Sequence, residues 1–358
     1  MVSEAMLERL VSNTDIRVVD AMRKIDANAE GILFLTNEGG RLTGCVTDGD
    51  IRRWLIKTGD LQAQISRIMN RDPKFLKEGE RRKKRQIMRK YAVRVLPVLD
   101  EGQKIVDVLF DENKAHIAPV VSNTLTDVPV VIMAGGKGTR LYPYTKILPK
   151  PLIPIGDIPI VERIINQFMV FGCRKYHMIV NFKKNMIKAY FNEIEKDYEI
   201  IFADEEMPLG TGGGLSLLKG KIDKTFILSN CDILVREDFS KIFATHKEHG
   251  NLITMVCSLK SYPIPYGVVH LDGDGQLDRV EEKPQMSFLT NTGCYIVEPE
   301  VIGELEENRV IGFPDIVLEY RQAGRRVGIY PVSEQSWLDM GQMDTLEDMR
   351  KQLESMSE

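Results

Sequence analysis

One segment near the middle of the chain combines glycines and cations at a spacing suited to phosphate chemistry. It reads VVIMAGGKGTRLYPYTKILPKP and covers residues 130–151. Its apolar start does not alternate, which predicts a buried parallel strand. The glycines that follow let the backbone turn and approach a ligand closely, so that successive N–H groups can converge on phosphate oxygens. These glycines are Gly135, Gly136 and Gly138, and the cations available to a polyphosphate are Lys137, Arg140, Lys146 and Lys150.

A second position suited to chemistry is the carboxylate of Asp232. It follows the apolar segment TFILSN, residues 225–230, which is predicted to be another buried strand. A carboxylate at the C-terminal end of such a strand points into the crevice of a parallel sheet, and a hard oxygen ligand suits Mg²⁺. The adjacent Cys231 is interpreted as a packed thiol, because no histidine adjoins it in the sequence.

The glycine loop departs from both familiar phosphate-binding patterns. The Walker pattern needs four residues between its glycines before Gly-Lys-Ser/Thr, and the dinucleotide pattern needs G-x-G-x-x-G. With its proline-rich tail, the loop instead resembles the signature of the sugar-1-phosphate nucleotidyltransferases, G-G-x-G-T-R-L-x-P-x-T…P-K-P. The later segments LGTGGGL, YGV, VEEKP, NTGCY and WLDMG resemble further segments of the same family, in the family's order.

This resemblance implies roles for individual residues. The nucleotide would contact Ala134, Gly135, Gly136, Gly138, Thr139, Arg140, Gly212 and Gly213. The sugar phosphate would contact Gly267, Glu282, Lys283 and Asn291. Asp232 and Asp339 would share Mg²⁺, and the catalytic residues would be Arg140, Lys150, Asp232 and Lys283.

The reaction that the resemblance implies is nucleotidyl transfer. An oxygen of a sugar 1-phosphate would attack the α-phosphorus of a nucleoside triphosphate, giving a nucleotide-sugar and pyrophosphate, with no protein nucleophile. GTP is the favoured donor, with glucosamine 1-phosphate or a mannose-1-phosphate-like sugar as acceptor; uridylyl or thymidylyl transfer to glucose 1-phosphate is the alternative. A non-catalytic nucleotide sensor is a rival of another class, although a sensor has no need for two metal carboxylates and a second phosphate site.

Residues 128–358 are predicted to form one α/β domain. Helix-like and strand-like segments alternate, with helices at 158–171 and 183–195 and strands at 176–180 and 199–202. This alternation predicts a Rossmann-like, doubly wound mixed sheet, the nucleotide-diphospho-sugar transferase fold that the resemblance implies. A last helix is expected from Asp344 to Leu353.

Residues 1–120 are predicted to form a smaller α+β domain built from an internal repeat. A shift of roughly 63 positions aligns ILFL at 32–35 with VLPV at 95–98. The region resembles a tandem CBS-domain module, and TDGDIRR, residues 47–53, is its clearest motif. In that family Thr47 and Asp50 would contact a regulatory nucleotide, whereas Phe110 and Asn113 stand at the matching positions of the second copy. Residues 121–127 are interpreted as the linker, and the fusion is similar to glucosamine-1-phosphate guanylyltransferases of legionaminate biosynthesis.

The composition indicates an ordinary globular protein of the cytoplasm. The 358 residues carry a net charge of −4, which gives no reason to expect nucleic acid as a partner. No apolar run is long enough for a membrane span, and the first ten residues have no secretion-signal pattern. The five scattered cysteines predict reduced, buried thiols, and His246 and His249 are interpreted as part of a solvated helix end rather than a metal site. A homo-oligomer is expected.

Overall fold

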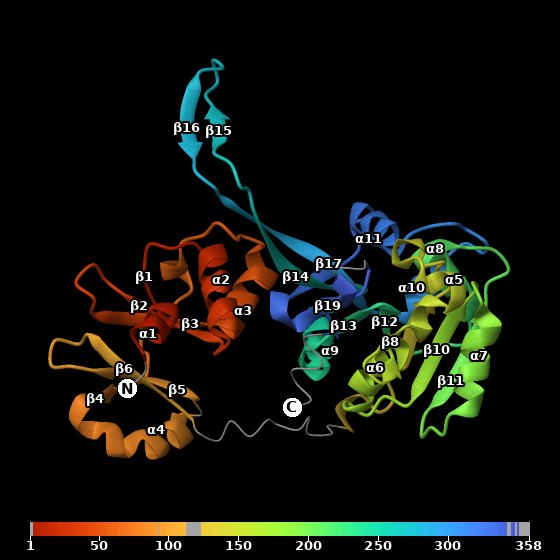
Figure 1. Ribbon diagram of the computed structural model, residues 1–358, viewed down its shortest axis with the longest axis horizontal. Coiled ribbons are helices and arrows are strands. Elements are labelled where there is room, and N and C mark those ends of the chain that lie inside the picture. The colour runs from red at the N-terminus through yellow and green to blue at the C-terminus, as the bar shows by residue number, and fades with distance from the viewer. Residues whose placement is uncertain (1–2, 92, 112–122, 342–344, 348, 351–358) are drawn as a thin grey trace. The chain divides into compact units, whose positions relative to one another are not determined.

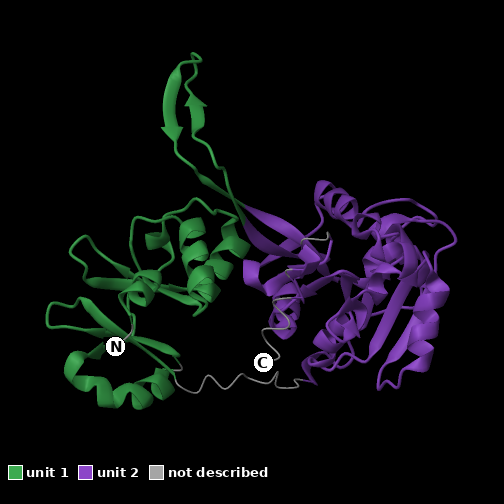
Figure 2. Cartoon of the chain, viewed as in Figure 1, with its two compact units in different colours: residues 1–118, 261–287 green, residues 119–260, 288–358 purple. Residues whose placement is uncertain are grey.

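The chain forms two compact units (Figure 2). A computed structural model describes residues 3–91, 93–111, 123–341, 345–347 and 349–350. The first unit comprises Met1–Ala118 and Ser261–Ser287, and the second comprises Pro119–Lys260 and Phe288–Glu358. The sequence does not predict that the segment Ser261–Ser287 groups with the N-terminal region. None of the helices that the structure describes has the length and apolar character needed to cross a bilayer.

The first unit contains two copies of one strand motif. In each copy a short first strand pairs parallel with a second, which pairs antiparallel with a third. Ile32 lies opposite Thr47 in the first copy, and Val95 lies opposite Phe110 in the second. Both residues of the second pair lie 63 positions after the corresponding residues of the first pair. The predicted internal repeat is therefore confirmed. The strands are β1 (Val11–Asn13), β2 (Ile32–Thr36), β3 (Leu42–Thr47), β4 (Leu76–Lys77), β5 (Val95–Leu99) and β6 (Ile105–Phe110).

The two copies bury apolar side chains in a shared core. Its buried members come from both copies and are Leu10, Phe34, Cys45, Val95 and Val108. The backbone N–H of Leu42 also donates to the carbonyl of Gln103 across the copies, at 3.0 Å. Neither copy could bury this face alone, so each stabilises the other. The helices of the unit (Figure 1) are α1 (Glu4–Leu10), α2 (Val18–Asn28), α3 (Asp48–Thr58) and α4 (Lys84–Tyr91).

Thr47 and Asp50 form the N-terminal cap of α3. The hydroxyl and the backbone N–H of Thr47 donate to Oδ2 of Asp50 at 2.6 and 2.9 Å, and the backbone N–H of Asp50 donates to Oγ1 of Thr47 at 3.3 Å. Such a reciprocal cap satisfies donors that a helix start leaves open, which accounts locally for both residue types. Their contact with a regulatory nucleotide remains a prediction, and Asn113 of the second copy lies outside the described residues.

The second unit is built on a seven-stranded mixed sheet. Its order is β11-β10-β7-β12-β17-β14-β18. The strands from β11 to β12 run parallel, β17 pairs antiparallel with β12, and β18 pairs parallel with β14. Every residue of β7 is buried, as its unbroken apolar run predicts. The strands are β7 (Val130–Ala134), β10 (Lys175–Val180), β11 (Glu199–Asp204), β12 (Phe226–Asn230), β14 (Ile253–Pro263), β17 (Gln285–Val297) and β18 (Val327–Val332).

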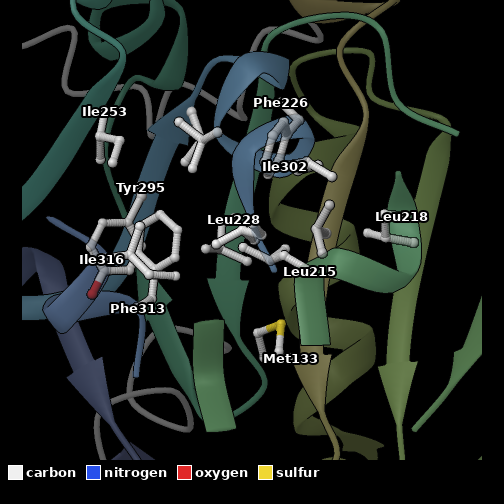
Figure 3. Close-up of a cluster of buried hydrophobic side chains, with 14 of the residues drawn as sticks. Met133, Leu215, Leu218, Phe226, Leu228, Ile253, Tyr295, Ile302, Phe313 and Ile316 are labelled. Carbon is white, nitrogen blue, oxygen red and sulfur yellow. The ribbon is translucent and has the colours of Figure 1, made fainter. Parts of the chain in front are cut away.

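Helices and strands alternate through the first half of this unit, as predicted. The helices are α6 (Ile160–Met169), α7 (Lys184–Glu193), α9 (Phe239–His249), α10 (Pro299–Glu304) and α11 (Phe313–Gln322). The predicted helix at 344–353 begins and ends outside the described residues. In the core (Figure 3), the ring of Tyr295 on β17 packs edge-on against Phe313 of α11, with centroids 4.5 Å apart, and Leu228 of β12 lies in the same cluster. This packing fixes the ends of β7 and β12, where the site is formed.

His177 on β10 is an ionisable side chain within this core. It is 1% exposed, and neither ring nitrogen has a hydrogen-bond partner among the described residues. Burial lowers the pKa of His177 to about 4, with the charge of Lys175 acting in the same direction. An unfolded histidine binds its proton near pH 6.5, so between these values the unfolded chain holds more protons than the folded chain.

We therefore expect acid to weaken the fold through His177. As pH falls from about 6.5 to about 4, this group should lower the free energy of unfolding by up to about 3 kcal/mol. His177→Leu should remove that part of the pH dependence and leave stability at pH 8 similar or higher. Urea unfolding of both proteins at several pH values measures the difference, and parallel curves for the two proteins would contradict the assignment.

Candidate functional site

A cavity of about 350 Å³ lies in the second unit, at the C-terminal ends of β7 and β12. Ligands of open α/β sheets bind at such strand ends. Most of the predicted loop and strand-end residues line the cavity, so a pattern spread over about a hundred residues of sequence becomes one surface. The lining residues are Met133, Gly135, Gly136, Gly138, Thr139, Arg140, Lys150, Glu205, Pro208, Gly210, Thr211, Asn230, Cys231 and Asp232.

The glycine loop allows close contacts that a side chain would prevent. A Cβ built on Gly135 would lie 2.5 Å from Oε2 of Glu205. Gly138 has a φ of +64° and precedes a short helical turn at Thr139–Leu141, and a Cβ there would lie 2.9 Å from Cγ2 of Thr145. These two positions therefore require glycine, one for space and the other for space and backbone conformation. Ala134 ends β7 directly before the loop and is itself buried.

Lys183 fixes the far side of the loop. Its ammonium group donates to the backbone carbonyls of Lys146 at 2.5 Å and Ile147 at 2.7 Å. These carbonyls belong to α5 (Tyr144–Ile147), a single turn whose open acceptors favour a cation. The next turn begins at Lys150, so this contact restrains the backbone that carries that side chain.

Lys150 and Asp232 form an ion pair on the cavity wall. The Nζ atom of Lys150 contacts Oδ2 of Asp232, and the two side chains are only 11% and 13% exposed. The stem of Lys150 lies against the glycine loop, since a Cβ on Gly138 would be 3.2 Å from Cβ of Lys150. The predicted cation and the predicted carboxylate are therefore brought together beside the predicted phosphate loop.

Asp339 is placed next to Asp232 by a strand pair. In the pair of β13 (Ile233–Val235) and β19 (Trp337–Asp339), Ile233 lies opposite Asp339. The backbone N–H of Met340 donates to the carbonyl of Asp232 at 2.9 Å. Burial raises the pKa of Asp339 and the negative charge of Asp232 raises it further, while Lys150 and Arg140 oppose the shift. Three predicted residues, Asp232, Lys150 and Arg140, thus act electrostatically on Asp339.

The two aspartates have the donor chemistry of a magnesium site. Magnesium is commonly bound by one or two carboxylates, with phosphate oxygens and waters completing the shell. The negative charge of Asp232, which raises the pKa of Asp339, also favours a bound cation beside the two carboxylates. Among the described residues there is no cluster of three or more His, Cys, Asp or Glu side chains suited to a metal.

Glu205 is a cavity residue that the sequence interpretation missed. It follows β11, is 5% exposed, and its Oε1 atom has no hydrogen-bond partner in the described part of the chain. Burial raises the pKa of Glu205 to about 7, although a hydrogen bond from the backbone N–H of Leu209 acts to lower it. A buried carboxyl oxygen without a donor is costly unless a ligand supplies one. The sequence gives no sign that Glu205 is a site residue, because it stands in an ordinary acidic stretch, ADEE.

Comparison with known proteins places this chain in a family. The family model described as "Nucleotidyl transferase" matches residues 129–356, more than half of the chain. The chain belongs to the nucleotidyl transferase family. The matched residues include the seven-stranded sheet, the glycine loop, Asp232 and Asp339.

Curated members of the nucleotidyl transferase family resemble the chain over the same region. A mannose-1-phosphate guanyltransferase of Candida albicans is 34% identical over 228 residues, which are 59% of this chain and 60% of that protein. A mannose-1-phosphate guanylyltransferase of Mycobacterium tuberculosis is 28% identical over 221 residues, 60% of this chain and 61% of that protein. The chain thus spans about three fifths of the length of these relatives. The crystal structure of HddC from Yersinia pseudotuberculosis is 22% identical, with a TM-score of 0.49, and covers 63% of this chain and 99% of its own.

Gly212 and Gly213, predicted to contact the nucleotide, face another part of the transferase unit. Both N–H groups donate to the carbonyl of Ile311, at 3.0 and 3.2 Å. A Cβ on Gly212 would lie 2.5 Å from Ile316 and one on Gly213 2.0 Å from the carbonyl oxygen of Arg309. The two glycines permit close packing of α8 (Gly210–Gly213), and their neighbours Gly210 and Thr211 line the cavity. Contact of Gly212 and Gly213 with the nucleotide remains a prediction.

We expect Gly213→Ala to destabilise the protein strongly. The added methyl group would overlap the carbonyl of Arg309, and relief would require a backbone shift costing about 3 kcal/mol or more. Gly136→Ala is the matched control, because a Cβ there meets nothing within 4 Å. Thermal unfolding compares the two, and similar midpoints for both variants would show that the packing argument is wrong.

The predicted sugar-phosphate residues are divided between the units. Gly267, Glu282 and Lys283 belong to the first unit, where a Cβ on Gly267 would lie 3.0 Å from Oε2 of Glu282. Asn291 belongs to the second unit, where its Nδ2 donates to the hydroxyl of Tyr295 at 2.5 Å and its Oδ1 accepts from the N–H of Gly293 at 3.0 Å. Their role towards a sugar phosphate remains a prediction.

The remaining polar candidates have structural roles. All five cysteines are free and buried, and burial raises the pKa of the Cys231 thiol to about 12. His246 is fully buried rather than solvated, which corrects the prediction for that helix end. Its ring bridges Oγ1 of Thr254 at 2.8 Å and Oε1 of Glu298 at 3.1 Å. His246 thus ties α9 to β14 and the end of β17.

Proposed function

We propose that the protein transfers a nucleotidyl group from a nucleoside triphosphate to a sugar 1-phosphate. The observation that carries the proposal is the convergence of Arg140, Lys150 and Asp232 on one cavity with the glycine loop. Both similar curated proteins are named as guanylyltransferases of mannose 1-phosphate. A cavity that combines backbone N–H groups, two cations and carboxylates suits a triphosphate, because phosphoryl-type transfer depends on positioning and charge neutralisation.

In this proposal the residues act on the two substrates without a protein nucleophile. The sugar-phosphate oxygen forms a bond to the α-phosphorus, and the bond from that phosphorus to the bridging oxygen of pyrophosphate breaks. The N–H groups of the glycine loop and the guanidinium of Arg140 hold the β- and γ-phosphates. Lys150 neutralises the α-phosphate, and Lys283 holds the attacking phosphate.

Asp232 and Asp339 would hold Mg²⁺ in this proposal. The ion would supply positive charge to the phosphates, an effect worth several kcal/mol in related chemistry. The contribution of the protein is the placement of both carboxylates by one strand pair.

Glu205 supports guanine as the base. Guanine carries two adjacent donors, N1–H and the N2 amino group, whereas the matching edge of uracil or thymine carries a single N–H between two carbonyl acceptors. The two oxygens of a carboxylate accept from both guanine donors. Glu205 lines the cavity, and its Oε1 atom, which lies beside Gly214, has no hydrogen-bond partner among the described residues, so this carboxyl is the acceptor available to that edge.

Glu205→Gln is expected to change the preference among nucleoside triphosphates. The amide keeps the shape but replaces one acceptor with a donor, so kcat/KM for GTP should fall tenfold to a hundredfold, equivalent to about 1–3 kcal/mol. For UTP or dTTP, kcat/KM should either fall less than it does for GTP or rise. Competition between triphosphates in one reaction measures the ratio directly, and an unchanged ratio would remove Glu205 from base selection.

The proposed activity is tested by assaying pyrophosphate release for four nucleoside triphosphates against a panel of sugar 1-phosphates. GTP with mannose 1-phosphate or glucosamine 1-phosphate is expected to be the best pair, and release should require both substrates. Tight nucleotide binding without release in any combination would favour a sensor over an enzyme.

A further inference from the structure

The segment Ser261–Ser287 has little core of its own. It contains the antiparallel pair of β15 (Val268–Leu271) and β16 (Leu277–Glu281), seen as the hairpin in Figure 1. Every residue of β16 is exposed. An isolated two-stranded hairpin is marginally stable in water, so its position depends on contacts at its base. The segment carries Gly267, Glu282 and Lys283, which the proposed function assigns to the sugar phosphate.

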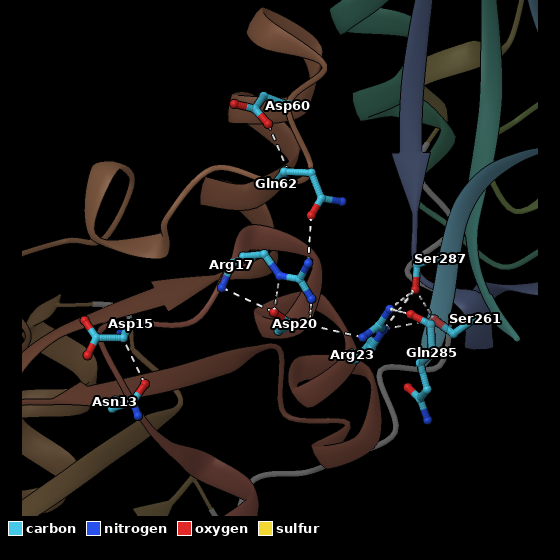
Figure 4. Close-up of polar contacts among 10 residues, drawn as sticks. All are labelled: Asn13, Asp15, Arg17, Asp20, Arg23, Asp60, Gln62, Ser261, Gln285 and Ser287. Atoms are coloured by element: carbon cyan, nitrogen blue, oxygen red, sulfur yellow. Dashed lines mark hydrogen bonds and ion pairs between the residues drawn. The ribbon is translucent and has the colours of Figure 1, made fainter. Parts of the chain in front are cut away.

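Arg23 of α2 binds both ends of this segment (Figure 4). Its Nε donates to Oγ of Ser287 at 2.9 Å and to Oγ of Ser261 at 3.3 Å. Its Nη2 donates to the backbone carbonyl of Gln285 at 2.8 Å. The hydroxyls of Ser261 and Ser287 are themselves 2.7 Å apart. One guanidinium therefore holds the first and the last residue of the segment together. The last residue, Ser287, is only four positions after Lys283 in the sequence.

The guanidinium of Arg23 is held in this direction by its own helix. Its Nη1 donates to Oδ1 of Asp20 at 3.0 Å, and Asp20 also accepts from Nε of Arg17 at 2.8 Å. Arg17 in turn donates to Oε1 of Gln62 at 2.9 Å. Arg23 is 22% exposed, so water competes only partly for its donors. A guanidinium whose orientation is already fixed loses little conformational entropy when it binds, so more of the hydrogen-bond energy remains to hold the segment.

We propose that Arg23 is a positioning residue through which the N-terminal repeat sets the affinity for the sugar 1-phosphate. The proposal rests on the proposed function for the role of Lys283, and goes beyond it by assigning control of that role to α2. The guanidinium holds Ser261, Gln285 and Ser287 in one arrangement. Because Gln285 is close to Glu282 and Lys283 in the sequence, this arrangement restrains the backbone position of these two residues. The nucleotide cavity contains no residue of this segment, so the effect should be confined to the second substrate.

The first test needs no activity. Hydrogen–deuterium exchange of the full chain is compared for the wild type, Arg23→Met and Arg67→Met, an exposed arginine of the same unit. Arg23→Met should speed exchange in peptides from residues 261–287, roughly tenfold, as expected for the loss of bonds from a charged donor. Peptides of β7 and β12 should be unchanged. Equal exchange in the segment for all three proteins would overturn the proposal.

The second test separates the two substrates kinetically. Arg23→Met should raise KM for the sugar 1-phosphate by roughly five- to tenfold, with KM for the nucleoside triphosphate unchanged. Ser287→Ala should act in the same direction, and adding it to Arg23→Met should have little further effect, because both remove the same contact. Equal increases in both KM values, full additivity, or the same effect from Arg67→Met would each contradict the role of Arg23. If the wild type itself has no transferase activity, the proposed function fails, and the exchange experiment still decides whether Arg23 orders the segment.

Discussion

Asp232→Asn is expected to lower kcat by about a thousandfold or more. The change keeps the shape of the side chain but removes the charge that would bind magnesium and that pairs with Lys150. Loss of metal-assisted charge stabilisation costs several kcal/mol of the barrier, and each 1.4 kcal/mol is about tenfold in rate. Pyrophosphate release under saturating substrates measures the effect.

The matched control for Asp232→Asn is Asp197→Asn. Asp197 is 69% exposed and its ion pair with Arg174 is 3.8 Å long, so this variant should keep near-normal turnover. Circular dichroism of both variants establishes that the fold is retained. Activity of folded Asp232→Asn comparable with that of Asp197→Asn would remove the metal assignment.

Lys150→Met is expected to reduce kcat/KM for the nucleoside triphosphate by about a hundredfold to a thousandfold. The ammonium is the most buried cation of the cavity wall, and a charge held where water is largely excluded stabilises a phosphate more than an exposed charge does. Methionine keeps much of the length of the side chain and removes only the charge. Lys150→Arg should also be impaired, because a planar guanidinium does not place its charge where the compact ammonium lies beside Asp232.

Lys224→Met is the control for the loss of a lysine in the same unit, because Lys224 is exposed. Initial rates at varied triphosphate concentration, with the sugar 1-phosphate saturating, give kcat/KM for each variant. A Lys150→Met enzyme as active as Lys224→Met would show that the ammonium does not serve the transferred phosphate.

The sequence was most informative where a local pattern determines the backbone. The unbroken apolar run of β7 and the glycines after it predict a strand followed by a turn, and the structure shows the buried strand with the glycines lining the cavity at its end. The repeat of the first unit was also visible, because the same strand register recurs after 63 residues.

Long-range packing limited the other predictions. Gly212 and Gly213 stand in a glycine cluster like any ligand loop, and their close approach to Arg309 and Ile316, which adds a packing role, has no signal in the sequence. Glu205 became a candidate through burial without a partner, a property that no spacing in the sequence records. The grouping of Ser261–Ser287 with the first unit depends in part on Arg23, more than two hundred residues earlier.

The most direct test of the central claim follows the phosphorus atoms of GTP. The protein is incubated with a sugar 1-phosphate and GTP labelled either at the α- or at the γ-phosphorus, and the products are separated. The account predicts that the α label enters the nucleotide-sugar and the γ label enters pyrophosphate, in equal amounts. Recovery of the γ label as free phosphate, or of the α label only as free guanine nucleotide, would contradict nucleotidyl transfer at the glycine-loop cavity.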